Sequence, residues 1–312
     1  MTDLQTSIQA SIETPTKTAD GRPLPDGFRL RPYADESDVK VGVAIANADL
    51  AADGVQGRES EDDYLAFLHH PNDNFDVARD VFIAEVDGVQ VGFAEKNWVD
   101  THDGLYREYR LGGAVLPEWR GRGIGSVLLE ENERRARAQA AAHATDRKTA
   151  FGGWNDDKQV TRMELYRRHG YEPVRWFFDM IRPLSEPIPE VPLPEGIEVR
   201  PVTRETVRPV WDADTEAFQD HWGGFDTSDE QLARWLARPS FDPTLWVVAY
   251  DGDQVAAGVI NAIETEENEA LGVNRGWLHS VFTRRPWRKR RSSPDVSIAG
   301  APRGSVRHHA RW

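Results

Sequence analysis

The chain contains one segment plan twice. LPDGFRLRP, which begins at Leu24, returns as LPEGIEVRP beginning at Leu193, 169 positions later. The pair Trp119-Arg120 returns as Trp287-Arg288, 168 positions later. Matching segments at a nearly constant spacing indicate an internal duplication. We therefore expect the 312 residues to hold two copies of one domain, which their number allows.

A hairpin is predicted in the middle of each copy. VFIAEVDGVQVG begins at Val81, and the similar LWVVAYDGDQVAAG begins at Leu245. In both we expect two strands joined by an Asp-Gly turn, because these residues accept the positive φ of tight hairpin turns.

The first copy is predicted to be an α/β (α+β) domain. Apolar periodicity and turn residues predict strands at 28–31, 81–86, 89–99, 109–116, 149–152 and 175–181, and helices at 37–48, 61–69, 126–142 and 160–169. In the third helix we expect Ser126 to be the N-cap and Val127, Leu128 and Ala138 to face the core. Strands that come first in hairpins and later alternate with helices predict a mixed, mostly antiparallel sheet flanked by helices.

The pattern divides the chain into five parts. Residues 1–23 form a polar tail expected to be disordered, 24–184 the first domain and 185–195 a proline-rich linker. Residues 196–290 form an incomplete second domain of the same kind, and 291–312 an aberrant basic tail. The prolines of the linker oppose a helix and favour an extended chain.

Composition excludes several classes of protein. There is no cysteine, which rules out disulfides and thiolate chemistry and fits a cytoplasmic location. No apolar run predicts a membrane span, and the first residues lack a signal-peptide pattern. The net charge of -14 makes nucleic-acid binding by the body of the protein unfavourable. No spacing of histidines and carboxylates predicts a metal site.

A glycine-rich loop, Arg120-Gly121-Arg122-Gly123-Ile124-Gly125, lies between a predicted strand and a predicted helix. Glycines let the backbone turn tightly and bring bare N–H groups to a ligand. The following helix directs the positive end of its dipole at the same place, so the loop suits a pyrophosphate. A purely structural turn is the alternative. A Walker loop is excluded because Gly-Lys-Ser/Thr is absent, and a dinucleotide fold would place the glycines after its first strand.

Two motifs carry a family resemblance. AVLPEWRGRGIGSVLLEENERRA resembles the acetyl-coenzyme A signature of the GCN5-related N-acetyltransferase (GNAT) superfamily. MELYRRHGYEPV, from Met163 to Val174, resembles the later Leu-Tyr-x-x-x-Gly-Phe/Tyr motif of the same superfamily. The resemblance covers residues 24–184, and the doubled layout is similar to that of tandem members.

The resemblance implies a role for each matching residue. Backbone groups of Gly113, Ala114 and Val115 are expected to bind the pantetheine arm of acetyl-CoA. The loop from Arg120 to Ser126 is expected to hold the pyrophosphate, which involves Arg120, Gly121, Arg122, Gly123, Ile124, Gly125 and Ser126. The asparagine that the superfamily places before its tyrosine is Gln159 here, and Asn155 is a candidate to replace it.

The implied reaction is direct acyl transfer to an amine. Tyr166 matches the tyrosine that protonates the departing thiolate, and backbone amides near Val115 or Leu116 steady the oxyanion. Glu108 is our first candidate for the general base, with Glu95 and Asp100 as alternatives.

The second copy departs from this plan after Trp287. Arginine or lysine replaces the first glycines of the loop, and the tail from 291 has no helix pattern. We interpret the tail as the product of a reading-frame shift just after Arg290. The alternative is that RRPWRKRR is a nucleic-acid-binding or targeting patch.

Two functions of different class follow from the sequence. The first is an N-acetyltransferase that moves an acetyl group from acetyl-CoA to a primary amine of a small-molecule or peptide acceptor, without a metal. The second is a catalytically impaired module that binds acyl-CoA and has a regulatory role. Peptidyl transfer from aminoacyl-tRNA is disfavoured because the loop that coenzyme A needs is intact.

Overall fold

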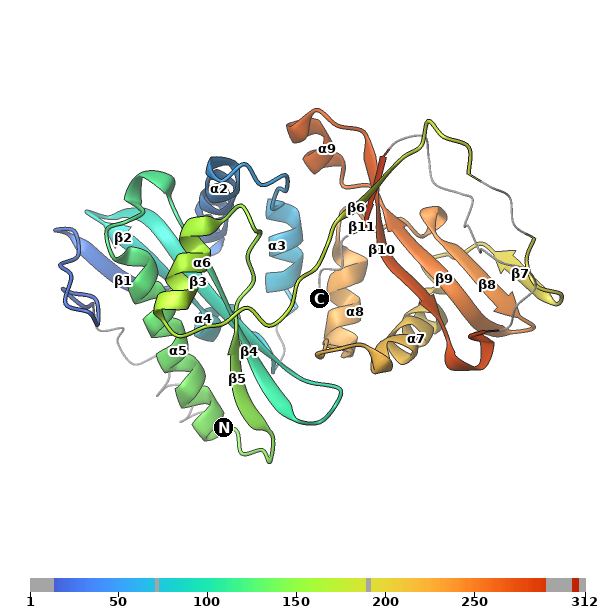
Figure 1. The fold of residues 1–312 in the computed structure, drawn as a ribbon, viewed down its shortest axis with the longest axis horizontal. Helices are drawn as coiled ribbons and strands as arrows, with labels where there is room; N and C mark the ends of the chain where they lie inside the picture. Colours follow the sequence, from blue (N-terminus) through green and yellow to red (C-terminus); the bar gives the residue numbers. More distant parts are fainter. Residues whose placement is uncertain (1–13, 71–72, 189–191, 290–304, 309–312) are drawn as a thin grey trace. The chain divides into compact units, whose positions relative to one another are not determined.

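The computed structural model describes residues 14–70, 73–188, 192–289 and 305–308, and it divides into two compact units (Figure 1). The first unit comprises Met1–Pro173 together with Gly223–Arg234. The second comprises Val174–Trp222 and Trp235–Trp312. Each unit is built on one β-sheet.

The first unit has the predicted mixed sheet. Its elements are β1 (Phe28–Pro32), α2 (Glu36–Ala52), α3 (Glu61–Leu68), α4 (Val77–Asp80), β2 (Val81–Val86), β3 (Val89–Asp100), β4 (Tyr106–Val115), η1 (Pro117–Trp119), α5 (Ile124–Ala142), β5 (Lys148–Gly152) and α6 (Val160–Arg168). The strand order is β1-β2-β3-β4-β5. The pair β4–β5 is parallel and the other neighbouring pairs are antiparallel.

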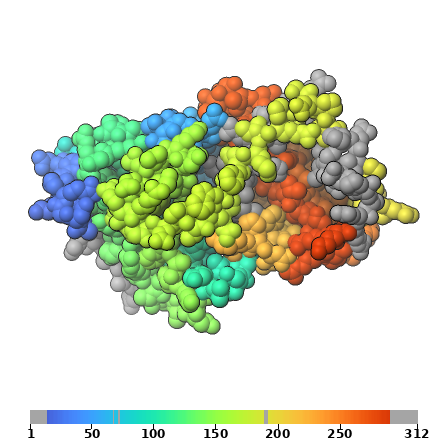
Figure 2. Space-filling model, viewed as in Figure 1, coloured from blue at the N-terminus to red at the C-terminus, as the bar shows by residue number. Residues whose placement is uncertain are grey.

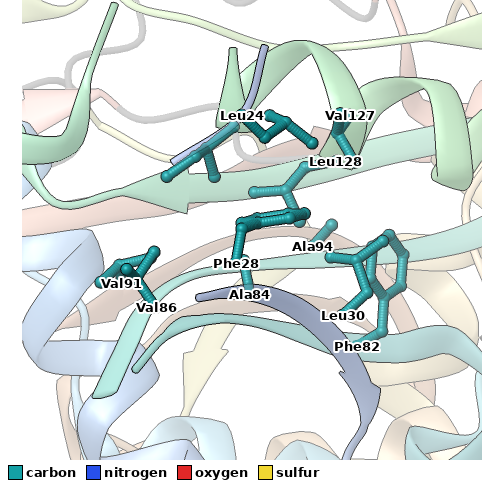
Figure 3. Close-up of a cluster of buried hydrophobic side chains, with 11 residues drawn as sticks. Leu24, Phe28, Leu30, Phe82, Ala84, Val86, Val91, Ala94, Val127 and Leu128 are labelled. Atoms are coloured by element: carbon teal, nitrogen blue, oxygen red, sulfur yellow. The ribbon is translucent and has the colours of Figure 1, made fainter. Parts of the chain in front are cut away.

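Helices cover both faces of this sheet (Figure 1). On one face, Val127 and Leu128 of α5 pack with Phe28, Phe82 and Ala94 of the strands (Figure 3). On the other face, apolar residues of α2 and α3 pack on the side chains of β2, β3 and β4. Burial of these two apolar layers is the main favourable contribution to folding.

Helix α5 differs from the prediction in its start and in its buried stripe. It begins at Ile124 with Gly123 as N-cap, so Ser126 is a buried residue of the first turn. Ala138 is exposed, whereas the polar Asn132 is 1 % exposed. Asn132 donates hydrogen bonds of 3.0 Å to the carbonyls of Glu95 and Gly112. The buried stripe therefore contains polar groups that bind the sheet, which apolar periodicity does not detect.

Two segments outside the predicted first domain belong to the first unit. Residues 14–23 of the tail expected to be disordered have a defined turn, with Lys17 bridged to Pro23. The segment Gly223–Arg234 holds most of α8 (Asp229–Ala237). It is bound by the N–H of His102, which donates to the Gly223 carbonyl at 2.7 Å.

The second unit repeats the strand plan of the first. Its elements are β6 (Met180–Pro183), β7 (Ile197–Arg200), α7 (Val207–Ala217), η2 (Phe218–Asp220), the end of α8, η3 (Pro243–Leu245), β8 (Val247–Asp251), β9 (Gln254–Ala262), α9 (Thr265–Leu271), β10 (Arg275–Thr283), η4 (Arg285–Trp287) and β11 (Ser305–His308). The sheet order is β6-β11-β10-β9-β8-β7. Its antiparallel run β7-β8-β9-β10 corresponds to β1-β2-β3-β4, and a cluster around Val210 and Val248 forms its core.

Two segments differ from what the sequence predicts. The strand expected at 175–181 as the last of the first domain is β6, at Met180–Pro183, and it pairs with β11 in the second sheet. The apolar sequence there predicts a strand but contains no information about its partner. Within the tail described as aberrant, Ser305–His308 form β11, which is parallel to β10 as β5 is to β4. The rest of that tail lies outside the described residues.

The duplication extends to details of backbone geometry. The β2–β3 register shifts between Ala84 and Glu85, and the β8–β9 register shifts between Ala249 and Tyr250. The two turns differ by one residue, however. Val86 pairs with Val89 around Asp-Gly, whereas Asp251 pairs with Gln254 around Gly-Asp, so the second turn is not the predicted Asp-Gly.

Candidate active site

The parallel strands β4 and β5 separate halfway along β4. Their pairing runs from Tyr106 to Arg110 on β4, and among the described residues no strand continues it beside Leu111–Val115. The N–H of Leu116 donates to Val91 of β3 at 2.9 Å. Because successive backbone groups point to opposite edges of a strand, the N–H of Val115 points toward the open edge. This excludes Leu116 as an oxyanion donor and leaves Val115.

The glycine loop continues from this open edge into α5. Gly121 and Gly123 have φ of +76° and +87°, which residues with a side chain adopt at a cost. A Cβ at Gly121 would meet nothing within 4 Å, whereas one at Gly123 would lie 2.8 Å from Thr18. The first N–H groups of α5 have no carbonyl partner within the helix. Together with the helix dipole they form a site for an anion.

These elements enclose a cleft with about 840 Å³ of space free of protein atoms, part of it open to solvent. One wall is the open edge of β4, a second is the glycine loop with the start of α5, and a third is α6. Among the predicted residues, the cleft is lined by Gly113, Ala114, Val115, Arg120, Gly121, Gly123, Gly125, Ser126 and Tyr166. Helix α6 lies at the surface of the molecule (Figure 2).

Three predicted residues make contacts away from the cleft wall. The guanidinium of Arg122 stacks on the ring of Trp119 at 4.6 Å. Ile124 is 1 % exposed, so only its backbone is suited to contact a ligand. The side chain of Asn155 donates to the carbonyl of Asp156 at 2.9 Å. Asn155 is therefore engaged in its own loop.

Gln159 and Arg120 bind the end of α2 beside the cleft. The amide of Gln159 donates to Asp49 at 3.1 Å and accepts from the N–H of Asp156 at 3.0 Å. The guanidinium of Arg120 binds the carboxylates of Asp49 and Asp53 at 2.6 and 2.8 Å. Its charge is therefore compensated by the end of α2, which assigns Arg120 to anchoring the loop.

The second unit has the same anchor. Arg120 donates to the Asp49 carbonyl at 3.0 Å, and Arg288 donates to the Ala217 carbonyl at 2.8 Å. The two arginines are 168 positions apart in the sequence, and so are the two residues whose carbonyls accept. Arg288 also binds Asp220, as does Arg285. At the position of Gly121, however, stands Lys289 with φ of +63°. The Trp-Arg repeat thus has a structural cause, and ion pairs disfavour a nucleic-acid role for these arginines.

Tyr166 lies where β4 and β5 part. Its hydroxyl donates to the Leu111 carbonyl on the open edge at 3.2 Å. Gly153 makes room for it, because a Cβ there would lie 2.4 Å from the phenol oxygen. Burial raises the pKa of Tyr166, so the phenol keeps its proton at neutral pH. A protonated phenol beside the open edge suits a general acid.

The three candidate bases have different surroundings. Glu108 is paired with Arg110 at 3.5 Å, and the Asp100 carboxylate is held by Arg107, which lowers its pKa. Glu95 lies over Gly112 of the cleft wall, with its Oε1 3.2 Å from the position of a Cβ there. Burial, and more weakly the charge of Glu59, raises the pKa of Glu95 to about 7.

The hydroxyl of Tyr64, on α3, donates to Glu95. Glu95 is one of the alternatives that the sequence left open, and the signal that distinguishes it is three-dimensional. The residue opposite it on the neighbouring strand is Gly112, a glycine of the cleft wall, and the Glu95 carboxylate lies against it.

The described residues contain no group of side chains suited to hold a metal ion. None of their helices is long and apolar enough to cross a membrane.

The comparisons with known proteins agree with this geometry. The family model of the acetyltransferase (GNAT) domain matches residues 78–173. The chain belongs to the GNAT superfamily and is an acyltransferase. Relatives described as mycothiol acetyltransferase include one from Geodermatophilus obscurus, 32 % identical over 225 residues, covering 71 % of this chain and 67 % of the relative. One from Salinispora arenicola is 30 % identical over 177 residues, covering 56 % of this chain and 52 % of the relative. The chain thus spans about half to two thirds of these relatives.

Solved structures show the same fold over most of the chain. A GCN5-related N-acetyltransferase from Sphaerobacter thermophilus has a TM-score of 0.61 at 22 % identity, covering 91 % of this chain and 87 % of that one. A tandem GNAT protein from the clavulanic acid biosynthesis pathway has a TM-score of 0.56 at 16 % identity, covering 90 % and 89 %. The second of these structures is itself described as a tandem protein.

Proposed function

We propose that the first unit transfers an acetyl group from acetyl-CoA to the primary amine of a small-molecule acceptor. The observation that carries this proposal is the cleft between the open edge of β4 and the glycine loop. It offers bare backbone groups along Gly113–Val115 and bare N–H groups at the start of α5. The former suit the amide-containing pantetheine arm and the latter suit a diphosphate.

Glu95 takes the place of Glu108 as the proposed general base. Glu95 accepts a proton from the amine, directly or through water, as the amine nitrogen bonds to the thioester carbon. The N–H of Val115 stabilises the oxyanion. As the C–S bond breaks, Tyr166 gives its proton to the sulfur, and the products are an acetamide and a free thiol. A carboxylate with a pKa of about 7 is a base matched to neutral pH.

The acceptor belongs to the proposal as well. Because the curated relatives are described as mycothiol acetyltransferases, the amine that those enzymes acetylate is the first acceptor to test. A panel of other small amines and peptide N-termini extends the test to different classes.

The decisive experiment measures thiol release from acetyl-CoA in the presence of each amine. We expect Tyr166→Phe and Glu95→Gln each to lower kcat by about 10²-fold or more, since a positioned acid or base contributes that much. Tyr106→Phe and Glu269→Gln, which change exposed side chains elsewhere, serve as matched controls. Acetyl-CoA binding without thiol release for any amine would instead favour the acyl-CoA-binding module.

A further inference from the structure

A turn that precedes the first domain lies against the glycine loop. Thr18 and Leu24 are 4 % and 9 % exposed, and Leu24 belongs to the core cluster that includes α5. A Cβ at Gly123 would lie 2.8 Å from Thr18 and 3.2 Å from Leu24. The turn is thus packed directly on the residue from which α5 begins.

Hydrogen bonds within the turn fix Arg22. The N–H of Thr18 donates to the Arg22 carbonyl at 2.9 Å, and the N–H of Arg22 donates to the Thr18 hydroxyl at 3.0 Å. Asp20 accepts from Nε of Arg22 at 3.0 and 3.1 Å. Hydrogen bonds from Thr18 and Arg22 lower the pKa of Asp20, so this carboxylate stays ionised at neutral pH. The Nε edge of the guanidinium is thereby held away from the cleft.

The other edge of the guanidinium points toward α5. Nη2 of Arg22 donates to the hydroxyl of Ser126, in the first turn of the helix, at 3.3 Å, and Arg22 lines the cleft. Nη1 has no hydrogen-bond partner among the described residues. By contrast, Arg120 and Arg162, which line the same cleft, are bound to Asp49 at 2.6 Å.

We propose that Arg22 binds a phosphate group of acetyl-CoA, so that a segment outside the superfamily's motifs completes the cofactor site. A guanidinium presents parallel N–H donors that match phosphate oxygens, and it is always charged. The backbone amides of the loop contribute partial charges, and Arg22, which is paired with Asp20 at its Nε edge only, adds the donors of its other edge beside them. This inference rests on the proposed function, because it assumes that acetyl-CoA occupies the cleft.

The test is calorimetric titration of the full chain with acetyl-CoA. We expect Arg22→Gln to weaken binding about tenfold, the size of one charge-assisted hydrogen bond. Arg22→Lys keeps the positive charge without the parallel N–H donors of the guanidinium, and it is expected to lose less affinity for acetyl-CoA than Arg22→Gln. Arg29→Gln, which removes an exposed arginine on β1, is the matched control and is expected to bind like the wild type.

S-acetylpantetheine separates phosphate recognition from a general disturbance of the cleft. It carries the thioester without the diphosphate or the nucleotide, so kcat/KM for it is expected to be the same in Arg22→Gln and the wild type. The inference is overturned if Arg22→Gln and the wild type bind acetyl-CoA with equal affinity. It is also overturned if Arg22→Gln loses as much kcat/KM with S-acetylpantetheine as with acetyl-CoA. Failure of the wild type to bind acetyl-CoA overturns the proposed function instead.

Dephospho-CoA then locates the contact. If Arg22→Gln binds dephospho-CoA as the wild type does, the phosphate that Arg22 holds is the 3′-phosphate. If Arg22→Gln binds dephospho-CoA more weakly than the wild type does, the group that Arg22 holds is the diphosphate. Either result supports the inference.

Discussion

Alanine substitutions at three glycines separate backbone strain from ligand recognition. Gly104, Gly121 and Gly123 have φ of +76°, +76° and +87°. A side chain at such a φ costs about 1 kcal/mol. Around Gly104 and Gly121 a Cβ meets nothing within 4 Å, so strain is the whole effect on stability. At Gly123 the Cβ would lie 2.8 Å from Thr18, and this overlap adds about 1–3 kcal/mol.

The three variants therefore have different expected signatures. At about 2–4 °C per kcal/mol for a unit of this size, Gly104→Ala and Gly121→Ala are expected to lower Tm by about 3 °C, and Gly123→Ala by about 6–12 °C. In Gly104→Ala, which changes the β3–β4 turn, acetyl-CoA affinity is expected to be unchanged. In Gly121→Ala it is expected to fall about tenfold, since the methyl group occupies the approach to the loop.

Differential scanning fluorimetry and calorimetric titration measure the two quantities independently. If Gly121→Ala bound acetyl-CoA with wild-type affinity, bare backbone at this position would not be what the ligand needs. If Gly123→Ala were no less stable than Gly121→Ala, the packing of Thr18 on the loop would be wrong.

Three further predictions concern the base, the repeated anchor and the segment Gly223–Arg234. Because the active form of Glu95 is the carboxylate, kcat/KM is expected to rise with pH and level off above about 7, and Glu95→Gln should abolish that step in the pH–rate profile. Arg120→Met is expected to destabilise the protein by about 2 kcal/mol in chemical denaturation, because Asp53 loses its arginine partner and Asp49 loses one of two. Arg288→Met is expected to destabilise the protein less, because Asp220 is exposed and keeps Arg285, and no change in either variant would refute a shared anchoring role. Gly224→Val is expected to lower Tm, because a Cβ there would lie 2.0 Å from the Asp100 carbonyl, and an unchanged Tm would show that the segment is not packed on the first unit.

The sequence predicted the architecture of the first unit because local patterns determine it. The strands at 81–86 and 89–99 and the helix at 160–169 match β2, β3 and α6 within a residue. Their boundaries are set by an Asp-Gly turn and by Gly170, whose φ of +82° ends the helix. The repeat likewise predicted the matching strand order of the second sheet.

What the sequence could not supply is contact information. Ala138 and Asn132 show this in α5, where the polar residue is buried because two carbonyls of the sheet bind its amide. The pairing of β6 with β11 and the position of Arg22 beside Ser126 depend equally on distant residues.

The candidate site shows the same division. Most of the residues predicted from the motifs line the cleft, but the choice among carboxylates required the surroundings of Glu95. Arg120 is an example, since its motif position predicts a ligand contact but does not reveal its ion pairs with Asp49 and Asp53.

The central claim is that main-chain groups between β4 and α5 hold the donor. A crystal structure of the full chain with coenzyme A tests it most directly. We expect the diphosphate within hydrogen-bond distance of the N–H groups of residues 121–126 and the pantetheine arm along residues 113–115. A coenzyme A molecule bound anywhere else on the chain would contradict the account.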